Sequence, residues 1–332
     1  MSHRFESMTR RQWLAVNAAA TGSLWLGQAS AQSNYPAKPI TVIVPYAPGG
    51  QGDLFARLVG ERLTRSLGQP VLVDNKPGAT GALGARQAAK ARGDGYTLLL
   101  GQTGEMAVNR SAMKVPGYDS LADFRAVALV GDSPLVMAAP VAAPYNSLEE
   151  LLQLARSKPG SVSYASSGTA TPGHLAAAAL ANATKTDMLH VPYKGAGQAI
   201  TDLLGGQVQF LFSSASAILS HIKGGKVKAL AVTSARRLSA LPNVPTVAET
   251  TVPGFEFSLW GGFFAPSETP EPIIQRLHTE ITKALAEPDL RARLEAEGSA
   301  VAPMSSAQVD AFVRTEAEKY ASLVKLTGAK ND

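Results

Sequence analysis

The sequence predicts an α/β protein made of two α/β lobes with a ligand cleft between them. Short apolar runs rich in Val, Ile and Leu alternate with amphipathic segments along the chain, as expected when buried parallel strands alternate with helices. This alternation occurs in two successive sets of elements. Several of the predicted strands run into Gly- or Ser-rich turns, and in parallel sheets such turns open onto a ligand crevice.

The first set of elements lies between residues 40 and 100. Ile40–Val44 is continuous and β-branched, which predicts a buried strand. A Gly-rich loop follows, and Asp53 can cap a helix that ends before Gly68. We further expect a strand over 71–73, a helix over 78–91 and a strand over 96–100. This βαβαβ order, with right-handed crossovers, builds one parallel sheet.

The second set occupies the middle of the chain. Its predicted strands are 127–130, 135–138, 162–164, 189–191, 210–212 and 229–232, and its predicted helices are 148–155, 174–182, 198–204 and 218–222. After the segment 257–264, helices near 272–285, 288–297 and 306–326 complete the chain. Strands that pass between the two sets indicate a two-lobed clamp. We assign residues 32–132 and 251–332 to lobe 1, and residues 133–250 to lobe 2.

Composition limits the classes of function. The chain has 332 residues, of which 45% are apolar and 17% charged, so it is long enough and apolar enough for two cores. The net charge is +5, but the basic residues are spread without a stripe, which argues against nucleic-acid binding. Cysteine is absent, which excludes disulfides, thiol catalysis and cysteine metal sites. We expect a monomer without cofactor or metal.

The first 31 residues have the anatomy of an export signal. The paired arginines within Thr9–Leu14 precede a mildly apolar stretch over 15–26 and a small-residue cleavage site at Ala29–Ala31. The arginine pair resembles a twin-arginine signal, with general secretory export as the alternative route. We therefore expect a periplasmic mature protein. Three of the 31 Lys and Arg residues and one of the 26 acidic residues lie in this segment, which leaves a net charge of +3.

Two loops have the composition of anion-binding loops. The loop over 45–52 lies between a strand and a helix start, where backbone N–H groups and the helix dipole favour an anion. A second loop over 166–171 adds hydroxyl donors to the same arrangement. The alternative is that both loops only form tight turns. Together they predict a carboxylate site built from Tyr46, Gly49, Gly50, Gln51, Ser166, Ser167, Gly168 and Thr169.

Other candidates follow the ends of neighbouring strands. Asp53 either contacts ligand or caps its helix, and Lys194 either pairs with a carboxylate or lies solvated on the surface. Trp260 and Phe263 either stack on an aromatic acid or pack in the core. The remaining predicted ligand-binding residues are Gln102, Tyr193, Ser213 and Ser214.

Several catalytic motifs are absent or weak. The segment 78–84 has the spacing Gly-x-x-Gly-x-x-Gly, which suits close helix packing better than a dinucleotide site. There is no Walker motif and no Gly-x-Ser-x-Gly elbow. A hydrolase pair between Ser166 or Ser167 and His174 is conceivable, but no third orienting acid is evident, so we do not expect an enzyme.

Seven segments in order resemble one protein family. They are Pro45–Asp53 (PYAPGGQGD), Asn75–Gly81 (NKPGATG), Asp94–Leu98 (DGYTL), Tyr164–Gly168 (YASSG), His190–Gly195 (HVPYKG), Lys228–Thr233 (KALAVT) and Pro242–Glu249 (PNVPTVAE). The chain resembles the substrate-binding proteins of tripartite tricarboxylate transporters, known as the Bug family, over roughly residues 36–326. Gln209, where many relatives have an acidic residue, and Pro172 in the second loop depart from the usual pattern.

The resemblance implies a type II periplasmic-binding-protein fold that closes on its ligand. It also implies that a carboxylate such as an amino acid, an aromatic acid or a citrate-like acid binds at the two loops with the help of water. Membrane permease subunits are the implied partners. The sequence leaves open a second role, in which the ligand-loaded protein docks on a signalling receptor and feeds no transporter.

Overall fold

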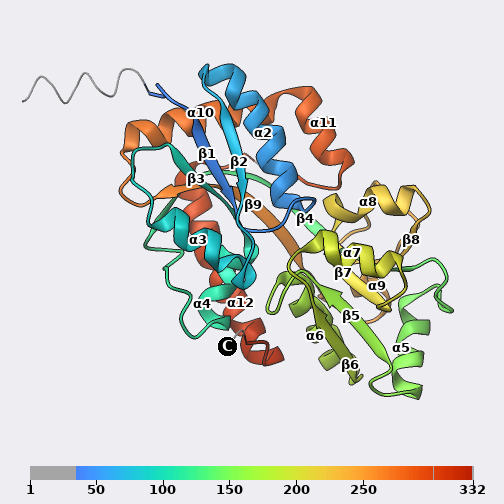
Figure 1. Ribbon diagram of the computed structural model, residues 1–332. Helices are drawn as coiled ribbons and strands as arrows, with labels where there is room; N and C mark the ends of the chain where they lie inside the picture. The colour runs from blue at the N-terminus through green and yellow to red at the C-terminus, as the bar shows by residue number, and fades with distance from the viewer. Residues whose placement is uncertain (1–34, 302, 331–332) are drawn as a thin grey trace, which may run out of the picture.

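The computed structural model describes residues 35–301 and 303–330. Figure 1 shows two α/β lobes side by side, joined by two long strands that pass between them. The predicted export signal lies outside the described residues. Within the described residues, no helix is both long enough and apolar enough to span a membrane.

The strands of the described residues form one curved sheet that runs through both lobes. The strand order is β2-β1-β3-β9-β4-β7-β5-β6, and β8 pairs with β4 outside this path. The bounds are β1 Ile40–Val44, β2 Val71–Asn75, β3 Thr97–Gln102, β4 Phe124–Pro140, β5 Val162–Ser166, β6 Met188–Pro192, β7 Phe210–Ser214, β8 Val227–Val232 and β9 Ser258–Pro266.

Each lobe contains the parallel unit that the sequence predicts. In lobe 1, β1 pairs in parallel with β2 and with β3. In lobe 2, β5 pairs in parallel with β6 and with β7. The carboxyl ends of both units face the space between the lobes, so the loops that follow these strands meet there.

Helices cover both faces of the sheet. They are α2 Gln51–Leu67, α3 Ala82–Ala89, α4 Asn109–Ala112, α5 Leu148–Ser157, α6 Pro172–Thr184, α7 Ala196–Leu204, α8 Ala215–Lys223, α9 Val247–Thr250, α10 Glu271–Ala286, α11 Pro288–Ala296 and α12 Ser306–Thr327. In lobe 1, α2, α10 and α11 share one core. In lobe 2, α7 and α8 share another. The third core extends from α3 and α12 in lobe 1 to α5 and α6 in lobe 2.

The two connecting strands correct the sequence prediction. The segments 127–130 and 135–138 are parts of one strand, β4, which pairs antiparallel with β9 over most of its length. The residues between them, Gly131 to Pro134, look like a break in sequence, but they continue the pairing through a register shift. The predicted boundary between residues 132 and 133 therefore lies inside β4, and the division into lobes remains a prediction.

Two other stretches differ from the prediction. The predicted helix over 78–91 is a short 3₁₀ turn, η1 (Ala79–Gly81), followed by α3, because Ala79 and Thr80 have positive φ and cannot continue a helix. A π-helix, η2 (Gly104–Val108), follows β3 and was not predicted. Neither α4 nor α9 was predicted, since each is only four residues long.

Candidate functional site

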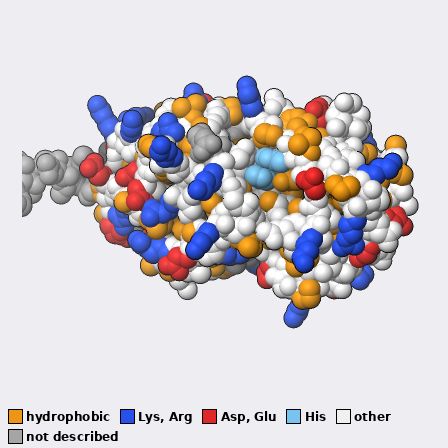
Figure 2. Space-filling view, turned by 90° about the horizontal axis from the view of Figure 1, so that it is seen from below, with side chains coloured by type: hydrophobic (Ala, Val, Ile, Leu, Met, Phe, Trp, Pro, Cys, Tyr) orange, Lys and Arg blue, Asp and Glu red, His pale blue; other side chains and the backbone are white. Residues whose placement is uncertain are grey.

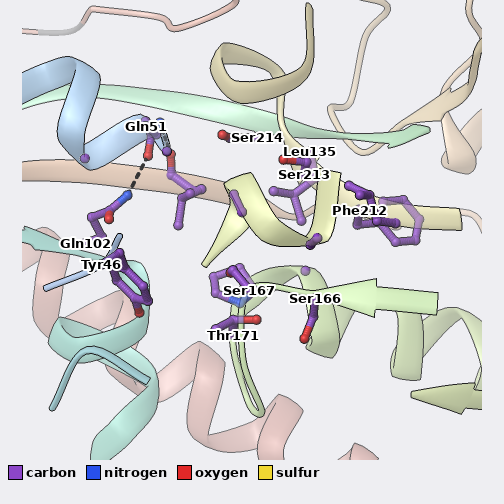
Figure 3. Close-up of a pocket in the computed structure, with 18 of the residues that line it drawn as sticks. Tyr46, Gln51, Gln102, Leu135, Ser166, Ser167, Thr171, Phe212, Ser213 and Ser214 are labelled. Atoms are coloured by element: carbon purple, nitrogen blue, oxygen red, sulfur yellow. Dashed lines mark hydrogen bonds between the residues drawn. The ribbon is translucent and has the colours of Figure 1, made fainter. Parts of the chain in front are cut away.

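A cleft between the lobes is lined by the loops that follow β1, β3, β5 and β7 and by the start of α7 (Figure 3). Four helices begin at this cleft, because Gly50, Thr171, Ala196 and Ser214 all line it and lie at the N-termini of α2, α6, α7 and α8. We call the part of the cleft at these helix starts the inner pocket. Within the described residues, no Lys, Arg or His side chain lines it. Attraction of an anion into this pocket would therefore come from the backbone dipoles of these helices.

The lobe 1 wall is held by a chain of amide hydrogen bonds. Gln102 Nε2 donates to Gln51 Oε1 at 3.2 Å, and Gln51 Nε2 donates to the Leu259 carbonyl at 2.6 Å (Figure 3). These bonds join the start of α2 to β3 and β9. Gly52 lets Gln102 approach, since a Cβ there would lie 2.6 Å from Gln102 Oε1. Both glutamines are nearly fully buried, so their positions in the wall are fixed.

Asp53 organises the first loop. The helix begins two residues earlier than predicted, at Gln51, and Asp53 lies in its first turn instead of capping it. Its carboxylate accepts a hydrogen bond from the Gly49 N–H at 3.2 Å and another from Arg57 Nε at 3.0 Å. Burial opposes ionisation, but these hydrogen bonds outweigh it and lower the pKa of Asp53 below its usual value. Asp53 is therefore a fixed anion at the edge of the cleft.

Glu105 supports the same wall from behind. It lies in η2 and is fully buried, and its Oε1 accepts the Gln102 N–H at 2.5 Å. Oε2 has no well-formed hydrogen bond, and both Oε2 and the Tyr46 hydroxyl border Gly81, where a Cβ would lie 3.1 Å from each atom. Burial raises the pKa of Glu105 to about 8, so the carboxyl is protonated at neutral pH. No sequence pattern had indicated it.

The lobe 2 wall rests on stacked aromatic rings. The rings of His174 and His190 are parallel, 3.7 Å apart, and both stack with Tyr164. His190 Nε2 lies 2.7 Å from Ser166 Oγ, and His174 Nδ1 accepts the Ala170 N–H at 2.8 Å. The stack thus holds the loop after β5 at two points.

This geometry corrects the hydrolase hypothesis in its detail. Ser166 contacts His190 and not His174, and Ser166 Oγ also donates to the Gly168 carbonyl at 2.8 Å. Burial lowers the pKa of His174 to about 3 and that of His190 to about 4, so both rings are neutral at pH 7. No carboxylate bonds to His190 within the described residues. The Ser–His contact therefore lacks the orienting acid of a catalytic triad.

The remaining lining is apolar and was not predicted. It comes from the connecting strands and from lobe 2, and an apolar residue on a strand gives no sequence signal that separates cleft from core. The residues missed are Leu135, Gly173, Ala196, Ala199, Leu211, Phe212 and Leu259, and Pro172 lines the cleft as well. Ala47, Gly52 and Thr171 also line it, and they lie within the two predicted loops although they were not singled out as ligand contacts. Gln209 lies outside the cleft, where its Oε1 accepts hydrogen bonds from Ser163 N and Oγ.

The predicted site residues fall into two adjoining pockets. The inner pocket is lined by Tyr46, Gly50, Gln51, Asp53, Gln102, Ser166, Ser167, Ser213 and Ser214. A second, outer pocket is lined by Tyr46, Ser167, Gly168, Thr169, Tyr193 and Lys194, among others. Gly49 lines neither, but its N–H holds Asp53. Trp260 and Phe263 are fully buried in the core.

The lobes touch at the mouth of the cleft. A Cβ on Gly195 would lie 3.2 Å from Ala47 Cβ, and a Cβ on Gly168 would lie 3.4 Å from Thr80 Oγ1. The structure therefore shows the cleft with its lobes in contact. Among the described residues, no group of three or more potential metal ligands occurs. Figure 2 shows charges of both signs scattered over one face of the molecule, without a continuous basic stripe.

Comparison with known proteins identifies the family. The model of the tripartite tricarboxylate transporter family receptor matches residues 55–329. The chain belongs to this family. BugT from Bordetella pertussis is 36% identical over 324 residues, which cover 97% of this chain and 99% of BugT.

Solved relatives of this Bug-family chain have the same fold. The periplasmic binding protein BugD is 34% identical with a TM-score of 0.86, covering 90% of this chain and 100% of BugD. R. palustris Rpa4515, solved with adipate, is 31% identical with a TM-score of 0.87, covering 89% of this chain and 99% of Rpa4515. The predicted family and the predicted two-lobed periplasmic-binding-protein fold are confirmed.

Proposed function

We propose that this Bug-family receptor captures a small carboxylate in the inner pocket and delivers it to the membrane permease of a tripartite transporter. The observation that carries the proposal is the convergence of four helix N-termini on the inner pocket, whose lining among the described residues includes no cationic side chain. Such a site favours an anion through oriented N–H groups. The relative Rpa4515, solved with adipate, supports a carboxylate as that anion.

Hydroxyl and amide side chains would complete the site. Ser167 and Thr171 of lobe 2 face Tyr46 and Gln102 of lobe 1 across the cleft (Figure 3). A carboxylate between them can accept hydrogen bonds from both lobes at once. Because those bonds all exist only when the lobes are together, ligand binding would favour the closed arrangement.

Binding is tested by calorimetry and by thermal shift on the exported form, residues 32–332. The panel contains mono-, di- and tricarboxylates and aromatic acids, each beside its uncharged amide, for example adipate beside adipamide. A ligand present at 100 times its Kd stabilises the fold by about 2.7 kcal/mol, which shifts the melting temperature by several degrees. We expect at least one acid to bind and its amide not to bind. If amides and acids bind equally, or no acid binds to protein unfolded and refolded to remove retained ligand, the proposal is wrong.

The permease partner needs a separate test. Ligand-loaded protein is used to capture detergent-solubilised membrane proteins of its own host. Recovery of the permease subunits supports the transport role. Recovery of a sensor kinase instead would support the alternative, in which the loaded protein signals.

A further inference from the structure

Glu105 lies directly behind the lobe 1 wall of the inner pocket. Its Oε1 accepts the N–H of Gln102, and the side chains of Gln102 and Tyr46 both line the pocket (Figure 3). Glu105 itself does not line the pocket and is fully buried in the π-helix η2. π-Helical turns are rare and lie frequently at functional sites. The carboxyl is therefore separated from the pocket by the residues of the wall.

The surroundings of Glu105 offer no hydrogen-bond donor to its second oxygen. Oε2 is buried without a partner, and so is Oδ1 of Asn109. The hydroxyl of Tyr46 already donates to the Thr80 carbonyl at 3.3 Å. The hydroxyl of Tyr118 donates to the backbone carbonyl of Glu105 at 2.7 Å. A buried carboxylate without donors is costly, so this environment favours the protonated carboxyl, which can itself donate a hydrogen bond.

The charged side chains around η2 are engaged elsewhere. Two of the elements that pack against η2, β3 and η1, carry no titratable side chain. On the helices around Glu105 the pairs are Arg110 with Asp119, Lys319 with Glu316, and Arg86 with the Pro116 carbonyl. Burial therefore raises the pKa of Glu105 to about 8, with no ion pair to oppose it among the described residues.

The other shifted groups near the wall keep one charge state between pH 7 and pH 9. Burial raises the pKa of Tyr46, of Tyr118 and, on α12, of Tyr320, so these hydroxyls stay neutral. On the cleft side the pKa of Asp53 is lowered, and those of the two stacked histidines are about 3 and about 4. Among these groups, Glu105 is therefore the one that changes its charge in this interval.

We propose that Glu105 is a positioning residue that sets the affinity of the inner pocket for anions. The neutral carboxyl holds Gln102 and Tyr46 in the wall, and the ionised carboxylate places a negative charge behind them and weakens the binding of an acid. This inference rests on the proposed function, in which the inner pocket holds a carboxylate. By linkage, a bound carboxylate makes Glu105 harder to ionise, so binding near pH 8 takes up a proton.

The test measures the affinity for carboxylates as a function of pH. The probes are adipate and the other mono- and dicarboxylates of the panel, which stay ionised from pH 7 to pH 9. A charge one layer of side chains away changes anion affinity by about tenfold, so the wild type should bind about fivefold more weakly at pH 9 than at pH 7. Calorimetry at pH 8 in two buffers of different ionisation enthalpy should show uptake of about 0.4 proton per bound acid.

Glu105→Gln stays neutral and keeps an oxygen that can accept the Gln102 N–H. Its affinity should change by less than about twofold between pH 7 and pH 9, and its binding reaction should take up no proton, because the titrating group is gone. Glu318→Gln, on an exposed glutamate of α12, is the matched control and should keep both the pH dependence and the proton uptake of the wild type.

Two results overturn the inference while the proposed function stands: acids that bind the wild type equally well at pH 7 and pH 9, or an affinity of Glu105→Gln that falls with pH as steeply as that of the wild type. Should Glu105→Gln fail to fold, binding to the wild type without proton uptake at pH 8 overturns it instead. If no acid of the panel binds at pH 7, the proposed function fails and this inference fails with it.

Discussion

Burial changes the protonation state of Glu105 at neutral pH, because it raises the pKa of this carboxyl to about 8. A protonated carboxyl behind Tyr46 and Gln102 gives the lobe 1 wall a neutral hydrogen-bonding group, and an ionised one would place an uncompensated charge in the core. The native state binds this proton more tightly than the unfolded chain, because the pKa is raised from 4.5 to about 8. The contribution of Glu105 to the free energy of unfolding is therefore fully present below pH 4.5 and is lost as the pH rises toward 8.

Glu105→Gln should flatten that pH dependence. Glutamine has nearly the same shape and stays neutral, so the melting temperature of the variant should fall less than that of the wild type between pH 5 and pH 8. Scanning calorimetry at half-unit steps measures it. Glu318→Gln, on an exposed glutamate of α12, serves as the control and should keep the wild-type slope. Parallel profiles for wild type and Glu105→Gln would show that Glu105 is ionised in the fold.

The stacked histidines titrate in the opposite sense. Both pKa values are lowered from 6.5, to about 3 for His174 and about 4 for His190, so the unfolded chain binds these protons more readily than the fold. The contribution of the two neutral histidines to the free energy of unfolding is therefore fully present above pH 6.5 and is lost as the pH falls toward 4. His190→Gln retains an N–H donor for Ser166 and cannot be protonated in this range. It should therefore lose less stability than the wild type between pH 6.5 and pH 4.5, whereas the control His221→Gln, on α8, should lose as much as the wild type.

At the scale of elements, the loop after β5 depends on how closely α6 approaches β7. A Cβ on Gly173, in the first turn of α6, would lie 2.4 Å from the Phe212 carbonyl oxygen, a backbone atom that cannot move independently. The cleft wall formed by Thr171 and Phe212 therefore depends on a residue without a side chain.

Gly173→Ala should lower the free energy of unfolding by about 2–3 kcal/mol, the upper range for overpacking. Gly50→Ala is the matched control, because Gly50 also begins a helix at the cleft, has φ −93° and has open space around its Cβ. We expect the control to cost less than about 1 kcal/mol. Urea denaturation with a shared slope compares them. Equal effects of the two changes would mean that the contact between α6 and β7 is looser than described.

Periodicity and turn chemistry predicted most elements, including both parallel units and the helix over 148–155, which the Ser147 hydroxyl caps by accepting the Glu150 N–H at 3.1 Å. They failed where tertiary contacts decide the local structure. The β4 segment around Gly131 stays extended because β9 pairs with it. The π-helix η2 is buried behind the lobe 1 wall of the cleft, and no local sequence pattern predicts a π-helix there. In the cleft, glycines and hydroxyls were predictable from loop composition, whereas Leu135, Phe212 and Leu259 resembled ordinary core residues.

For the whole molecule, the contact between Ala47 and Gly195 offers a direct test of closure. The chain has no cysteine, so a pair introduced by Ala47→Cys and Gly195→Cys has no competing thiol. A Cβ at position 195 would lie 3.2 Å from Ala47 Cβ, slightly closer than the 3.5–4.5 Å of ordinary disulfides, and a small separation of the lobes satisfies it. Gly195 has extended backbone, with φ 170°, and tolerates a side chain.

The double variant should form the cross-link under mild oxidation, seen as faster migration on non-reducing gels. A bound carboxylate should accelerate the reaction, because it increases the closed population. The control pairs Ala47→Cys with Leu204→Cys, an exposed residue at the far end of α7, and should stay reduced. If both pairs oxidise at the same rate, the lobes move past one another freely. If neither oxidises with or without ligand, they do not close at this contact, and the cleft mouth is formed elsewhere.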